Sequence, residues 1–352
     1  MKPGWILVET LESDHMSVIG RAGEPRQRTS LERAVQDRLD TGHAPAAEAT
    51  RWLERTIGET RSAPRACEVT ITLKNHQQVH SRIVPITGPT ESLFAVWVWL
   101  GGGQDCCTVP ARTLAFCWDS DTRLAMIPSA HPGQIQSLTA PELFRFVHVP
   151  DSLSLIRTLL TPAPGAVWQG STMLRLADRN QPAHVCMVAG PTPELASLWQ
   201  GVLFETTSNA TATEGSLEAA ALDAMQLMAP AAYLALVDLA KMRLIRWITD
   251  PLTEVQWKGQ VDQRDTPHPE DVQRIFAAAA DVLAGRAQHA MVNRIRLRRR
   301  GGGWTLVDGV GAILRATTTE DGPPLALVQI QVIGHSDDPD PVPPDDLGHP
   351  GL

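Results

Sequence analysis

Between residues 268 and 307 the spacing of apolar residues changes from that of a helix to that of a strand, and this change constrains the possible folds of the chain more than any other feature. Apolar side chains recur at helical spacing from Val272 to Leu283, and Gly285 ends the run. Pro269 and the two acidic residues after it suit the first helical turn, where the helix dipole favours negative charge. From residue 294 to residue 300, arginines alternate with apolar residues, which is the period of a strand. The sequence therefore predicts a helix that leads into a strand.

The arginine-rich strand is predicted to have one solvent-exposed face. Its four arginines (Arg294, Arg296, Arg298 and Arg300) share one side, whereas Ile295 and Leu297 share the other. This alternation favours a solvated face, a weak anionic site or salt bridges to acidic groups of another domain over a nucleic-acid site. The net charge of −8 also argues against a nucleic-acid role for the whole chain. The glycines at 301–303 predict a turn, after which residues 304–307 return as the partner strand.

The flanking sequence completes a small α+β domain. Residues 233–238 and 244–248 are predicted to pair as strands, and residues 325–332 form a last strand. This order of elements resembles a PAS domain. The His-Pro-Glu-Asp sequence at 268–271, the helix, the basic strand and the Gly-Trp pair at 303–304 resemble a common PAS subfamily. The resemblance covers roughly residues 217–333.

Two further units precede this domain, and each repeats the same plan of elements. For residues 1–103 we expect a strand at 6–9, helices within 30–60 with Ser30 as N-cap, and strands at 68–73, 79–86 and 93–100. For residues 104–206 we expect a hairpin of 116–119 with 123–127, helices at 142–147 and 152–160, and strands at 167–177, 184–189 and 199–206. A strand-and-helix plan that occurs three times predicts an α+β protein of three consecutive PAS/GAF-like domains. Each domain would be a mostly antiparallel sheet with helices packed on one face.

The whole chain is similar to a known family. The opening sequence MKPGWILVETL, the length of 352 residues and the three sensor-like units resemble an actinobacterial (mycobacterial-type) family of stand-alone triple-sensor proteins. The resemblance implies PAS–GAF–PAS architecture, with sensor domains and no attached output domain. The residues themselves leave open whether each of the first two domains is of PAS or GAF type.

The segments outside the domains have distinct compositions. Residues 207–216 are small and polar, which predicts a linker, and residues 216–228 are predicted to form an amphipathic helix at the start of the third domain, 217–334. This helix could dock within the chain or on a second subunit. The tail at 335–352 is rich in Asp and Pro and is predicted to be disordered.

Catalytic and metal-binding signatures are missing from the sequence. It contains no GxSxG, HExxH or GxxxxGK[ST] motif, and its five cysteines form no CxxC pair. The adjacent pair Cys106-Cys107 could sense redox state or simply lie near a loop, and the sequence does not decide between the two. His268 and His289 are read as structural rather than as a base or a haem ligand. We therefore expect no catalytic residue, no cofactor and no metal site.

Aromatic residues give the one hint of a ligand pocket. Tyr233, Trp257, Phe276 and Trp304 could converge between the helix and the sheet of the third domain, where they would line a small-molecule site or form a solid core.

These features predict a non-catalytic, cytoplasmic sensory or regulatory protein. No apolar run is long enough to span a membrane, and no signal peptide is recognisable, so we expect no membrane insertion. Such a protein would bind an unidentified small molecule, or relay a state, by domain repacking, and it would act by contact with partner proteins. The alternatives are a constitutive interaction scaffold with empty domains and a cryptic enzyme.

Overall fold

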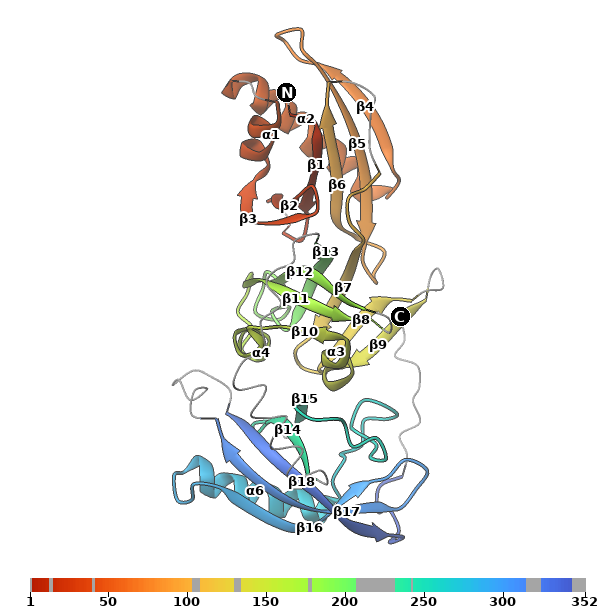
Figure 1. Ribbon diagram of the computed structural model, residues 1–352, viewed down its shortest axis with the longest axis vertical. Coiled ribbons are helices and arrows are strands. Elements are labelled where there is room, and N and C mark those ends of the chain that lie inside the picture. The colour runs from red at the N-terminus through yellow and green to blue at the C-terminus, as the bar shows by residue number, and fades with distance from the viewer. Residues whose placement is uncertain are drawn as a thin grey trace. The chain divides into compact units, whose positions relative to one another are not determined.

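The computed structural model contains three successive sheets and few helices. It describes residues 2–12, 15–39, 42–102, 108–129, 134–176, 179–206, 232–241, 243–314 and 324–343. The chain divides into two compact units: Met1–Leu138 with Phe146–Ala210, and Thr139–Arg145 with Thr211–Leu352. The first two sheets belong to the first unit, and the third sheet belongs to the second (Figure 1).

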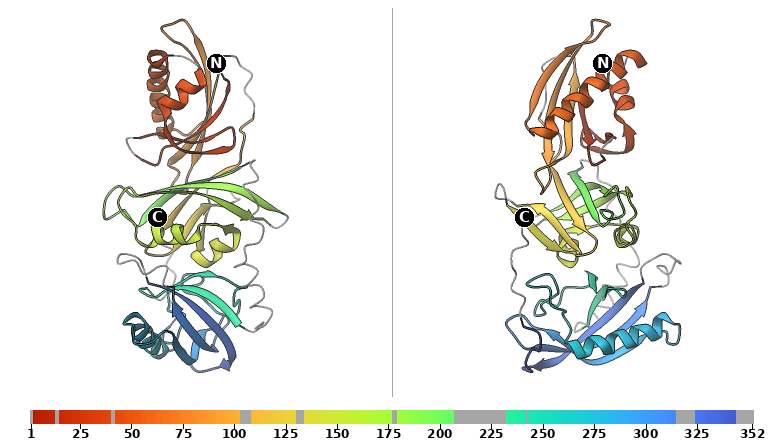
Figure 2. Two further views of the ribbon diagram at one scale, coloured as in Figure 1. Left: turned by 60° about the vertical axis from the view of Figure 1, so that its left-hand side comes forward. Right: turned by 180° about the vertical axis from the view of Figure 1, so that it is seen from behind.

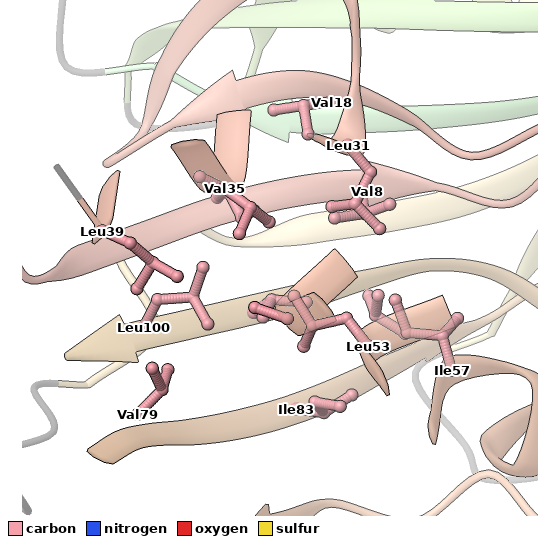
Figure 3. Close-up of a cluster of buried hydrophobic side chains, with 14 of the residues drawn as sticks. Val8, Val18, Leu31, Val35, Leu39, Leu53, Ile57, Val79, Ile83 and Leu100 are labelled. Carbon is pink, nitrogen blue, oxygen red and sulfur yellow. The ribbon is translucent and has the colours of Figure 1, made fainter. Parts of the chain in front are cut away.

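The first sheet has the strand order β3-β2-β1-β6-β5-β4, and its neighbouring strands are antiparallel. Its elements are β1 (Gly4–Glu9), β2 (Ser17–Arg21), β3 (Glu24–Ser30), α1 (Leu31–Leu39), α2 (His43–Ser62), β4 (Cys67–Thr72), β5 (Gln78–Thr87) and β6 (Leu93–Gly101). Both helices cover one face of the sheet (Figure 2). Leu53 and Ile57 of α2 belong to the same buried cluster as Val79 and Ile83 of β5 (Figure 3).

The central strand β6 is buried on both faces. Val96, Val98 and Leu100 pack under the helices, whereas Trp97 and Trp99 face the second sheet. We call the second set of contacts the shared core; its buried members are Trp5, Leu7, Ile19, Phe94, Ala95, Trp97, Trp99, Ala115, Cys117, Cys186, Val202 and Phe204. Because this core joins residues of both sheets, the first two sheets form a single compact unit.

The second sheet has the order β10-β11-β12-β13-β7-β8-β9. Its elements are β7 (Thr113–Asp119), β8 (Leu124–Pro128), β9 (Ile135–Thr139), α3 (Ala140–Phe146), β10 (Val147–His148), α4 (Ser152–Leu160), β11 (Val167–Arg175), β12 (Asn180–Ala189) and β13 (Leu198–Glu205). The side chain of Asp151 caps α4 by accepting from the Ser154 N–H group.

The third sheet has the order β15-β14-β18-β17-β16, so β16 is an edge strand. Its elements are β14 (Ala232–Asp238), β15 (Arg243–Trp247), α6 (Pro269–Leu283), β16 (Ala290–Arg298), β17 (Trp304–Ile313) and β18 (Leu325–Ser336). Ile295 and Leu297 join the core of this sheet, as the alternation predicts. Gly301, Gly302 and Gly303 form the predicted turn, and all three have positive φ.

The structure confirms the mostly antiparallel α+β class. The other predicted strands and helices within the described residues are present, but the short helices predicted between the second strand and the long helix of the third domain are absent, because residues 249–267 form turns, bends and isolated bridges. Strands β2, β3, β9 and β10 were not predicted. Residues 207–216 and 216–228, predicted as linker and helix, lie outside the described residues. The predicted disordered tail begins inside β18, and its first part is held to the domain because Arg264 binds Asp340 at 3.0 Å. No described helix is long and apolar enough to cross a membrane.

Candidate functional site

The chain before α6 covers the open edge of β16. The Gln256 N–H donates to the Arg298 carbonyl at 2.8 Å, and the Arg298 N–H donates to Thr266 at 2.8 Å. Two residues along β16, the His268 N–H donates to the Arg296 carbonyl at 2.9 Å. An uncovered edge strand would present unpaired backbone groups to other chains. The segment therefore completes the hydrogen bonding of the edge and places the His-Pro-Glu-Asp sequence beside it.

His268 has a structural position at the start of α6. Its Nδ1 accepts from the Glu270 N–H at 3.3 Å, and Pro269 occupies the first turn. The imidazole is 7% exposed and lies edge-on to Trp304, with ring centroids 5.0 Å apart. Both contacts fit the predicted structural role. His289, by contrast, is exposed in the turn after the helix.

Asp271 is the buried centre of an ionic cluster. It is 1% exposed, and its Oδ2 accepts from both the backbone N–H and the Nε of Arg296, at 2.9 and 2.8 Å. Arg274 binds Oδ1 at 2.8 Å, and Glu270 binds the other side of the Arg296 guanidinium at 2.7 Å. We call these four residues the Asp271 cluster. It attaches the first turn of α6 to the edge of the sheet.

The ion pairs set the charge states in this cluster. Burial raises the pKa of Asp271, but hydrogen bonds from Arg296 and Arg274 outweigh it and hold that pKa below its usual value. The hydrogen bond from Arg296 likewise lowers the pKa of Glu270, and Asp271 raises the pKa of Arg296. Asp271, Glu270 and Arg296 are therefore charged at neutral pH.

The arginine face of β16 is less exposed to solvent than the sequence predicted. Arg296 is bound in the Asp271 cluster, and Arg298 is 4% exposed, pairs with Asp340 and lies over the Trp304 ring at 5.0 Å. The expectation of salt bridges is correct, but the acidic partners belong to the same domain rather than to another one. Strand periodicity gives the side on which an arginine lies, and it cannot show which neighbours cover that side.

A groove of about 450 Å³ opens beside this cluster. It is lined from α6, β16, β17 and the end of β18. Arg294 reaches it from a β-bulge between Val292 and Ile295, where its φ is +52°. Bulges redirect side chains, and a positive φ in an arginine costs free energy that the surrounding structure must supply. The bulge is held in place because the Asp308 carboxylate accepts from the Arg294 N–H at 2.8 Å.

The four aromatic residues predicted to line a pocket do not form one group. Tyr233 and Trp257 both contact Trp247, at centroid distances of 6.3 and 5.2 Å. Phe276 is 44% exposed on α6, and Trp304 is fully buried against His268. Trp247 was not predicted, although its alternation with Ile245 along the strand marks both residues as inward-facing.

The described cysteines are buried or half-buried thiols. Burial raises the pKa of Cys117 to about 11 and that of Cys186 to about 12, so neither forms a thiolate readily. Cys106 and Cys107 lie outside the described residues. Within the described part of the chain, no group of three or more His, Cys, Asp or Glu side chains could hold a metal ion.

Two family models match the chain at its two ends. Residues 4–109 match the N-terminal domain described as Rv3651-like, and residues 219–317 match the Rv3651-like C-terminal domain. The chain carries both Rv3651-like domains. The first match covers the first sheet, and the second covers α6, β16 and the Asp271 cluster.

Solved structures extend the likeness along the chain. A crystal structure of an uncharacterised protein from Mycobacterium tuberculosis covers 94% of this Rv3651-like chain and 96% of its own, with TM-score 0.73 and 17% identity. At that identity the likeness shows a shared fold.

Two further structures are sensory proteins. An RNA-binding light-oxygen-voltage receptor has TM-score 0.23 at 12% identity, covering 63% of this chain and 96% of its own. The periplasmic sensory domain of the Campylobacter jejuni chemoreceptor Tlp1 has TM-score 0.19 at 9% identity, covering 62% and 71%. At these TM-scores neither likeness adds to the assignment of the fold, so the PAS–GAF–PAS description stays a prediction. No curated protein matches the chain.

Proposed function

We propose that this Rv3651-like chain is a non-catalytic regulatory protein built from PAS- and GAF-like domains. It binds a small molecule or relays a state in the cytosol, and it passes the signal on by contact with partner proteins. The observation that carries the proposal is the shared core, in which Trp97 of the first sheet contacts Phe204 of the second at a centroid distance of 6.4 Å.

The shared core supports a relay because it couples two sheets through close packing. Trp97 also lies edge-on to Trp5 at 6.4 Å, and its Nε1 donates to Thr113 in the second sheet at 2.9 Å. Close-packed interfaces change between discrete arrangements rather than deforming smoothly. A shift of β6 would therefore require the second sheet to repack. Such coupling would carry a change in one sheet to the other.

Native mass spectrometry of the purified full-length protein tests the sensory part of the proposal. A stoichiometric small molecule that is retained by the protein and released on denaturation supports sensing. Absence of any retained ligand, together with no thermal shift across a metabolite panel, would replace the sensor with a constitutive scaffold.

A hydrogen-exchange experiment tests the relay itself. Ligand binding is expected to change protection in β6 and in β13 together, since both contribute to the shared core. A protection change confined to one sheet contradicts a relay through the core. Reproducible turnover that one point mutation abolishes would instead establish an enzyme.

A further inference from the structure

The groove beside β16 presents two opposite charges that the protein does not pair. Arg294 and Asp338 both line it, and among the described residues neither side chain forms a hydrogen bond or ion pair. The other charges of the lining are already used, because Arg274 and Arg296 bind Asp271. One guanidinium and one carboxylate therefore stay available to a ligand.

Both residues have their backbones fixed while their side chains are unpaired. The Asp308 carboxylate holds the Arg294 N–H at 2.8 Å, within a bulge that places Arg294 at φ +52°. The N–H of Asp338 donates to the Ser336 hydroxyl at 3.1 Å, and its carbonyl accepts from the buried Trp304 indole at 2.9 Å. Backbone positions fixed in advance reduce the entropy that a ligand must overcome on binding.

The pair of charges determines which class of ligand fits. A simple anion would satisfy Arg294 and be repelled by Asp338, whereas a simple cation would do the reverse. A ligand carrying both a carboxylate and an ammonium satisfies both, and a guanidinium can hold a carboxylate by two parallel hydrogen bonds. The volume of about 450 Å³ lies within the range of small-molecule sites.

We propose that this groove binds a small zwitterion of the α-amino-acid class. Its carboxylate contacts Arg294 and its ammonium contacts Asp338. The Asn293 amide and Leu306 also line the groove, and they offer one polar and one apolar contact to the rest of the ligand. This inference rests on the proposed function, because it names the class of small molecule that the regulatory protein binds.

Binding to the full-length protein tests this inference with three probe sets. The first is the panel of free L-α-amino acids, the second their N-acetyl forms, which lack the ammonium, and the third their amides, which lack the carboxylate. Isothermal titration at millimolar probe is expected to show at least one free amino acid that binds. Its N-acetyl and amide forms should bind at least about tenfold more weakly, because each leaves one charge of the groove unpaired.

Two variants assign the contacts, and a third serves as control. Arg294→Gln should weaken the free amino acid at least about tenfold. Asp338→Asn should remove the preference for the free amino acid over its N-acetyl form. Arg286→Gln removes an exposed arginine that pairs with Asp281 on the same domain, and it should leave binding unchanged. Thermal melts of all three variants establish that they fold.

Three outcomes overturn the site. Equal binding of free and N-acetylated probes by the unmodified protein would make the groove a plain anion site. No binding by any free amino acid would exclude the ligand class. A small molecule retained in native mass spectrometry and unaffected by Arg294→Gln would place the ligand elsewhere, and in that case the regulatory function stands while this site fails.

Discussion

The shared core and the Asp271 cluster join elements of this molecule by opposite means. In the shared core, indole and phenyl rings from two sheets meet with few polar contacts. In the Asp271 cluster, the buried Asp271 carboxylate of α6 binds Arg296 of β16, and Arg274 of α6 donates to the Asn293 carbonyl of β16. Apolar packing responds weakly to salt, whereas an ionic contact depends on the charge of every member. The comparison teaches that the two units of the chain should respond to different changes in conditions.

The largest effect is expected from Trp97→Ala in the shared core. Trp97 is 1% exposed and touches both Trp5 and Phe204, so its removal leaves a large cavity. We expect a loss of about 3–5 kcal/mol in the free energy of unfolding, shared by the first two sheets. Denaturant unfolding with pulsed hydrogen exchange measures it. Trp97→Phe, the matched variant, should lose much less, and unfolding of one sheet without the other would contradict a single shared core.

The sequence predicted the fold well where one element determines its own burial. The continuous apolar run in β6 marks a strand buried on both faces, and the alternation in β16 places Ile295 and Leu297 in the core. Short strands such as β2 and β3 were missed because their residues are mixed and because they depend on neighbouring strands: β2 pairs with β1, and β3 pairs with β2. Local patterns contain no information about such partners.

The candidate site was much less predictable, and for the same physical reason. The sequence indicated that Arg296 lies on a strand face, but the partner that buries its charge, Asp271, is on a different element. The groove depends on a bulge at Arg294, which no local motif marks. Three of the four proposed pocket aromatics pack against other rings in the domain. The sequence does not show these neighbours, so it could not distinguish a pocket from a packed core. Sites made by long-range contacts need the structure.

Mild acid should destabilise the first unit more than the second, because His184 lies in the first unit. This side chain is 7% exposed against Phe204, and neither ring nitrogen has a partner among the described residues. Burial lowers the pKa of His184 to about 4 from its usual 6.5. As the pH falls, the unfolded chain therefore binds the proton before the folded chain does. The folded state keeps its full stability above pH 6.5, and it loses the contribution of the neutral His184 side chain as the pH falls towards 4. The loss at pH 4 is on the order of 3 kcal/mol.

Pulsed hydrogen exchange on the full chain between pH 7 and pH 4 checks this prediction. The first unit should weaken throughout that interval, and His184→Leu should remove most of the pH dependence. The Asp271 cluster should behave differently. Because the folded pKa of Asp271 is lowered, its contribution persists above the unfolded value of about 4 and is lost only below it. Equal weakening of both units at pH 5 would contradict the assignment.

A smaller effect is expected when the charge of the Asp271 cluster is removed at neutral pH. Asp271→Asn weakens the bonds from both arginines, and we expect a loss of about 2 kcal/mol, confined to the third domain. Glu270→Gln is the matched control, because Glu270 binds the same arginine from an exposed position and should change stability much less. Unfolding curves at two salt concentrations measure both variants. A larger effect for Glu270→Gln would show that the exposed pair, rather than the buried one, attaches α6.

The smallest effect is expected from removal of the N-terminal caps of α1, in the first unit, and of α6, in the second. Ser30 Oγ accepts from the Arg33 N–H at 3.4 Å before α1, and His268 Nδ1 accepts from the Glu270 N–H at 3.3 Å before α6. Both are long hydrogen bonds, so loss of either cap alone should cost about 0.5–1 kcal/mol.

Ser30 is exposed, whereas His268 also packs on Trp304. Ser30→Ala should therefore cost the cap only, and His268→Ala should cost the cap and the ring contact. His268→Asn restores the cap without the ring, so the difference between the Asn and Ala variants in urea unfolding isolates the cap. Equal stability of these two variants would mean that the His-Pro-Glu-Asp sequence uses its histidine for packing alone.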